Sequence, residues 1–192
     1  MRWNFLILIL AFILIHVKTK AVSGLDSLHV YQRIDISYCF GGQVYNDNFI
    51  YNPGISFQYV YGFMQNKYVG IGIGYGFQTF KNERFTPLYL EAIGYKKKNT
   101  NTSFIKMQIG YSIGWYEGNV NLTGYKYSGG FFIDAGVGRK ISLNNGFSLF
   151  FHWSYRHQFA KIEYEVFGTQ QYSEILNYDM LVISLSLLKE QE

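Results

Sequence analysis

Strict alternation of large apolar residues with small or polar ones is the feature that most constrains the fold of this chain. From Val69 to Phe77 every second residue is aliphatic or aromatic, and the four residues between them are all glycine. Residues 104–115 repeat the pattern. Successive side chains of a β-strand point to opposite faces, so a period of two is typical of a strand with two different surfaces. No window beyond residue 28 has the apolar spacing of an amphipathic helix, and the sequence therefore predicts an all-β protein.

Eight windows alternate in this way, and most are longer than the five or six residues common in soluble sheets. We place the strands at about 30–40, 53–63, 67–79, 86–96, 103–116, 126–141, 146–158 and 178–188. A strand that crosses a membrane at a tilt needs about 9–11 residues. Short connections alternate with mostly longer ones, as in barrels with short periplasmic turns and longer outer loops. The longer connections are predicted at 41–52, 80–85, 117–125 and 159–177.

The composition of the two faces distinguishes a membrane barrel from a secreted lipocalin-like barrel, which is apolar inside and polar outside. The water-exposed face of a lipocalin should be rich in Lys, Glu and Asp, whereas the second face here is mostly Gly, Ser and Gln. The chain has 16% charged and 20% aromatic residues, against about 25% charged residues in average soluble proteins. We predict an eight-stranded antiparallel up-and-down transmembrane β-barrel. A lipocalin-like carrier of an apolar ligand stays as an alternative.

The first 23 residues have the pattern of a secretory signal peptide. Arg2 precedes an apolar run at 5–15, and Ala21-Val22-Ser23 provides a small-x-small cleavage site. The apolar run is shorter than the roughly 20 residues that a transmembrane helix needs. We therefore expect a cleaved signal at 1–23 and the barrel at 24–192.

Charge, cysteine and histidine content exclude several classes of function. The chain has 17 basic residues, of which three lie in the expected signal, against 13 acidic residues, so the mature chain is nearly neutral. No basic stripe predicts nucleic-acid binding. The single cysteine, Cys39, excludes an internal disulfide and a Cys-based zinc site. His152 and His157 are five residues apart and face opposite sides of a strand, so we expect no metal site and no cofactor.

A resemblance to a known group of proteins covers about residues 28–188. It rests on three glycine-rich runs, which are Val69–Tyr75, Ile109–Gly114 and Asp134–Gly138. They resemble the small eight-stranded outer-membrane β-barrel proteins of Gram-negative bacteria, especially the outer-membrane beta-barrel domain family common in Bacteroidetes. The resemblance implies a non-enzymatic outer-membrane protein with a structural role or a surface-interaction role through its outer loops. The implied partners are outer-membrane lipids, lipopolysaccharide and an envelope or host surface partner, and the chain is expected to be a monomer.

Several charged residues are assigned to the inward face of the expected barrel. They are Arg33, Asp35, Glu91, Lys106, Asp134, Arg156 and Asp179. An unpaired charge in a narrow lumen is costly, so these groups should pair. A four-residue turn at 97–100 would place Glu91 opposite Lys106. A three-residue loop closed by Gly146 would place Asp134 opposite Arg156. We predict two interior ion pairs within a polar layer that stiffens the barrel.

An alternative function rests on His152 and Ser154, which lie two residues apart and so share one strand face. Glu163 and Glu165 follow in the next predicted loop. The arrangement is similar to lipid A 3-O-deacylases, which are also eight-stranded outer-membrane barrels and carry a His-x-Ser-Asn motif with a following acid. Tyr155 stands at the position of the motif's Asn. The resemblance implies a hydrolase with Ser154 as nucleophile, His152 as base and Glu163 as the acid.

Overall fold

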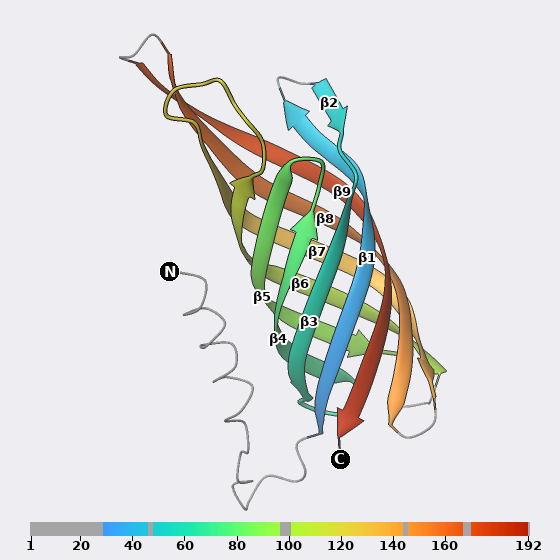
Figure 1. Ribbon diagram of the computed structural model, residues 1–192. Coiled ribbons are helices and arrows are strands. Elements are labelled where there is room, and N and C mark those ends of the chain that lie inside the picture. Colours follow the sequence, from blue (N-terminus) through green and yellow to red (C-terminus); the bar gives the residue numbers. More distant parts are fainter. Residues whose placement is uncertain (1–28, 46–47, 97–100, 144–145, 167–169, 192) are drawn as a thin grey trace, which may run out of the picture.

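The computed structural model describes residues 29–45, 48–96, 101–143, 146–166 and 170–191, and its strands wrap into a closed barrel (Figure 1). The expected signal at 1–23 lies outside the described residues. The strands are β1 (Val30–Tyr45), β2 (Asn48–Tyr51), β3 (Gly54–Met64), β4 (Val69–Thr79), β5 (Glu83–Tyr95), β6 (Asn101–Tyr116), β7 (Lys126–Ser142), β8 (Phe147–Val166) and β9 (Gln170–Gln191). No helix among the described residues is long and apolar enough to cross a membrane.

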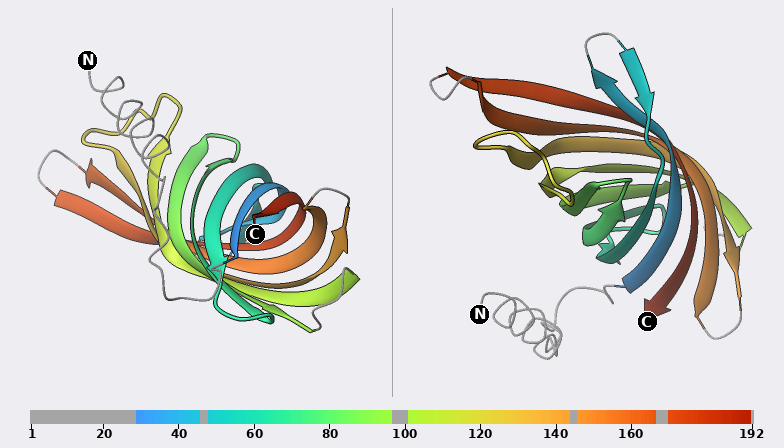
Figure 2. Two further views of the ribbon diagram at one scale, coloured as in Figure 1. Left: turned by 90° about the horizontal axis from the view of Figure 1, so that it is seen from below. Right: turned by 45° about the horizontal axis from the view of Figure 1, so that its top comes forward.

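Eight antiparallel strands close the ring, because β1 pairs with β3 on one side and with β9 on the other. Val30 is opposite Gln191, so the ring begins and finishes at the same end, here called the terminal end. The opposite end is called the far end. β2 is a short extra strand paired with the last residues of β1. The prediction of an eight-stranded up-and-down barrel is confirmed, and the left view of Figure 2 shows the ring from the terminal end.

The last hairpin differs most from the sequence prediction. β8 and β9 pair continuously from Phe147↔Lys189 to Val166↔Gln170, so most of the predicted loop at 159–177 is strand. The apolar alternation fades after Ala160 because residues 161–166 are partly exposed on both faces. No membrane or core then selects one face for apolar residues. The hairpin projects beyond the rest of the barrel at the far end (Figures 1 and 2).

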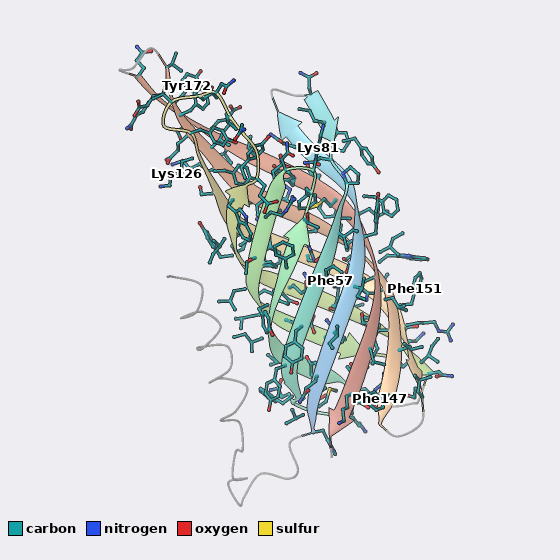
Figure 3. All side chains as sticks on the ribbon, in the orientation of Figure 1. Phe57, Lys81, Lys126, Phe147, Phe151 and Tyr172 are labelled. Atoms are coloured by element: carbon teal, nitrogen blue, oxygen red, sulfur yellow. The ribbon has the colours of Figure 1, made fainter. Side chains whose placement is uncertain are left out.

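The alternating faces lie on opposite sides of the barrel wall. The large apolar residues point outward, with Leu90 60% exposed and Ile113 65% exposed, and Figure 3 shows such side chains projecting from the wall around Phe151. The glycine-rich and polar face lines the interior, where Gln78 and Gln108 are fully buried. The lipocalin-like alternative requires the reverse arrangement and is therefore wrong.

Aromatic side chains fill the lumen toward both ends. The cluster at the terminal end includes Tyr31, Tyr95, Phe104, Phe150 and Leu188. The cluster at the far end includes Phe80, Phe85, Tyr127, Tyr178 and Met180. The inward glycines make room for these rings, since a Cβ at Gly74 would lie 2.3 Å from the ring of Tyr89. A polar layer lies between the two clusters.

Candidate functional site

The first part of the polar layer is built on Arg33, which β1 directs into the lumen beside Asp35. Arg33 Nε donates to Asp35 Oδ1 at 2.8 Å, and Arg33 Nη2 donates across the lumen to Glu91 Oε2 at 2.5 Å. Gln108 Nε2 donates to the same Glu91 oxygen at 2.8 Å. The Arg33 guanidinium also lies over the ring of Phe150, 5.7 Å from its centroid. One buried cation therefore forms ion pairs with two buried carboxylates from different strands.

The second part is built on Asp134 of β7. Asp134 Oδ2 accepts from Arg156 Nε at 2.9 Å and from Ser154 Oγ at 3.1 Å. Lys106 Nζ lies 3.4 Å from Asp134 Oδ1. One buried carboxylate here pairs with two buried cations, whereas in the Arg33 group one buried cation pairs with two carboxylates. Together the two groups hold three cations and three anions, so the polar layer is neutral overall.

The β7–β8 hairpin has the register that the sequence predicts. Leu143 N donates to Phe147 O at 2.8 Å, and Gly146 has a φ of +75°, the left-handed conformation that the turn requires. Asp134 is consequently opposite Arg156. The glycines at 136 and 138 are opposite Ser154 and His152 and leave room for them, since an added Cβ would lie 2.5 Å from the Cβ atom opposite.

The predicted pairing of Glu91 with Lys106 is wrong, although both side chains are buried in the lumen as expected. Glu91 is opposite Gln108, and Lys106 is opposite Ile93, a shift of two residues from the predicted register. A shift of two keeps every side chain on its predicted face, which is why the faces are right and the partners are not. The expected turn at 97–100 lies outside the described residues. β6, the strand after this connection, pairs with β7 from Asn101 onward. Its first contact with the chain that leaves β5 is at Ser103.

The assignment of Asp179 to the lumen is also wrong. Asp179 lies on the outward face of β9, where it accepts from the Tyr155 hydroxyl and contacts His157 Nδ1 at 2.7 Å. The alternation that points Leu181 outward also points residue 179 outward. A lumen charge that the sequence analysis omitted is Lys140, which is buried near the terminal end and ion-paired with Glu190. Lys140 is six residues from Asp134 on the same strand, so the alternation alone places both side chains on the inward face.

The residues of the hydrolase alternative do not form a catalytic centre. Ser154 Oγ donates to Asp134, and neither ring nitrogen of His152 has a hydrogen-bond partner among the described residues. Both side chains are buried in the lumen. Glu163 is eleven residues beyond His152 along β8, which corresponds to roughly 36 Å at about 3.3 Å per residue. Its carboxylate pairs with Lys161 at 2.5 Å. The geometry needed to activate a serine is absent from these residues.

A polar lumen inside an apolar outer wall defines the fold as that of the small outer-membrane β-barrels. The structure of Neisserial surface protein A superposes with a TM-score of 0.58 at 11% identity, covering 83% of this chain and 96% of that one. The outer membrane protein OprG from Pseudomonas aeruginosa superposes with a TM-score of 0.60 at 8% identity, covering 88% of this chain and 98% of that one. No protein-family model matches the sequence, and the comparison with curated proteins finds no match.

Proposed function

We propose that the protein is an integral outer-membrane β-barrel of a Gram-negative bacterium, exported by its first 23 residues, with a non-enzymatic role in structure or surface interaction. The observation that carries this proposal is the continuous outward apolar face on all eight strands of the ring. Exposed residues on three of these strands include Ile36, Ile73 and Leu185. So large an apolar surface is unstable in water, whereas a closed barrel satisfies its backbone hydrogen bonds within a bilayer.

The filled lumen supports a structural role over a transport role. Barrels of eight strands are just wide enough for side chains to fill, and water-filled channels belong to larger barrels. Here the two aromatic clusters lie on either side of a neutral layer of paired charges. We therefore assign the polar layer to rigidity and not to ion or proton passage.

The far end supports the surface-interaction role. The β8–β9 hairpin extends beyond the ring, and the 117–125 connection contacts it through Glu165 N, which donates to Thr123 O at 2.9 Å. Tyr172 on this hairpin is 55% exposed, and Phe49 and Tyr51 on β2 are exposed as well. Aromatic residues of this kind are enriched in protein interfaces. Lipopolysaccharide or an envelope or host surface partner would meet this end first. The glycine-alternating strands favour the barrel family common in Bacteroidetes.

Cell fractionation tests the membrane assignment. We expect the protein in the outer-membrane fraction, with faster gel migration before boiling than after it, because the closed barrel resists detergent until heated. A soluble periplasmic protein measured in the same fractions is the control. Recovery of the folded protein in the soluble periplasmic fraction would contradict the proposal. Identical lipid A mass spectra with and without the gene are expected, since His152, Ser154 and Glu163 do not assemble into a hydrolase centre.

Surface labelling tests which end faces outward. The native Cys39 is fully buried, so an impermeant maleimide should report only an introduced cysteine. We expect Ser173→Cys, on the exposed far-end hairpin, to be labelled on intact cells. The matched variant Lys189→Cys, near the terminal end of β9, should be labelled only after the outer membrane is broken. The opposite pattern would show that the barrel is inverted.

A further inference from the structure

A groove of about 640 Å³ crosses the outer wall near the terminal end, over strands β4 to β8. Its floor follows a row of paired outward residues in which Gly94 is opposite Ile105, Ile105 is opposite Val137, and Val137 is opposite Trp153. The wall dips at Gly94 because no side chain stands there. A Cβ at Gly94 would meet only the side chain of Ile105, at 3.3 Å. The floor of the groove is thus apolar.

The rim of the groove toward the terminal end carries two cations on either side of a serine. Lys96 N donates to Ser103 O at 2.9 Å, and Ser103 is opposite Arg139 on the next strand. Adjacent strands lie about 4.8 Å apart, so the backbones of Lys96 and Arg139 are about 10 Å apart, with the short Ser103 side chain between them.

No described residue neutralises the charges on this rim. Lys96 and Arg139 are exposed, and neither forms an ion pair with another described residue. Among the residues that the structure describes, no acidic side chain lines the groove. Two long flexible cations and a hydroxyl can converge on one anion, and a guanidinium suits the oxygens of a phosphate. The rim therefore favours a negatively charged group next to an apolar floor.

We propose that this groove binds one anionic phospholipid of the periplasmic leaflet. Its phosphate lies between Lys96, Ser103 and Arg139, and one acyl chain lies on the floor over Gly94 and Ile105. This inference rests on the proposed function, because it requires the wall to face a bilayer. The terminal end carries the short turns, which in bacterial barrels face the periplasm. The occupant is therefore a phospholipid and not the lipopolysaccharide of the other leaflet.

Fluorescence quenching in vesicles tests the proposal, because Trp153 lies in the groove. Trp115 is near the far end, and Trp3 lies in the expected signal, so a Trp115→Phe background of the mature chain leaves Trp153 as the single reporter. The barrel is reconstituted in phosphatidylcholine vesicles with increasing fractions of brominated phosphatidylglycerol, and in a matched series with brominated phosphatidylcholine. The ratio of the two quenching curves gives the headgroup preference at Trp153. We expect phosphatidylglycerol to be preferred by about five-fold, a preference that falls in high salt.

Three variants locate the site. Lys96→Gln/Arg139→Gln should reduce the preference to about one by removing the phosphate contacts. Gly94→Leu should also reduce it, by filling the floor without touching the lumen. Lys189→Gln removes an outward cation at the same end but outside the groove, and it should leave the preference unchanged. A wild-type preference of one, or a full preference in the double variant, would overturn the inference while leaving the membrane assignment intact. Absence of quenching by either brominated lipid would instead overturn both.

Discussion

Asp134→Ala should lower the free energy of unfolding by at least about 3–5 kcal/mol, the usual cost of removing one partner from a buried ion pair. The loss should lie at or above this range because Asp134 is the shared anion of Lys106 and Arg156, both almost fully buried. Without it, two cations remain in the lumen with no carboxylate in contact. The measurement is urea unfolding of the barrel in lipid vesicles, followed by tryptophan fluorescence and by gel mobility.

Two matched variants isolate the cause of this loss. Ser154→Ala removes only a hydroxyl that donates to Asp134 and should cost about 1 kcal/mol. Asp179→Ala removes a carboxylate of the same type from the outer face, where it is partly exposed, and should also cost little. If Asp134→Ala were no more destabilising than Asp179→Ala, the lumen pairs would not contribute to stability. If Ser154→Ala kept full stability and abolished a measurable lipid deacylation, the hydrolase alternative would replace the structural one.

Arg33→Met should lower the free energy of unfolding by a similar amount, about 3–5 kcal/mol. It leaves excess negative charge in the lumen, whereas Asp134→Ala leaves excess positive charge. The change keeps most of the side-chain volume but leaves Asp35 and Glu91 buried without their shared cation. Gln108 still donates to Glu91, which is insufficient to neutralise a carboxylate. The same urea unfolding experiment measures the effect.

Neutralising the two carboxylates should reverse much of that loss. In Arg33→Met/Asp35→Asn/Glu91→Gln no buried charge is left unpaired, and a neutral group is far cheaper to bury than a charged one. Lys140→Met is the control for loss of a lumen cation, and it should cost less because its partner Glu190 is more than a third exposed. A triple variant as unstable as Arg33→Met alone would show that the guanidinium acts through packing over Phe150 and not through charge.

The two charge groups explain why a narrow barrel can hold the six buried charges of the polar layer. Each group has an excess charge of one unit, negative around Arg33 and positive around Asp134, and the two excesses cancel. The guanidiniums of Arg33 and Arg156 each lie 5.7 Å from the centroid of an aromatic ring, that of Phe150 or Phe132. The polar layer and the aromatic clusters are therefore packed as one interior.

Local pattern determined the faces of the eight ring strands and most of their extent. The alternation at 69–77 and 105–115 forces one set of side chains outward and the other inward, whatever the neighbouring strands are. The short β7–β8 connection also determined a register, because Gly146 supplies the left-handed residue that closes it. From that register follow the contacts of Asp134 with Arg156 and Ser154, which lie within one hairpin.

Tertiary structure decided what depends on residues distant in sequence. Arg33 and Glu91 are 58 positions apart and meet only because the ring closes, and no alternation pattern encodes which inward charges face each other across a lumen. The register of β5 with β6 depends on a connection whose length the sequence does not mark, so the sequence predicts the wrong partner for Glu91. The row of Lys96, Ser103 and Arg139 likewise exists only after three strands have paired. Period two encodes the direction of a side chain, whereas its neighbours depend on register and closure.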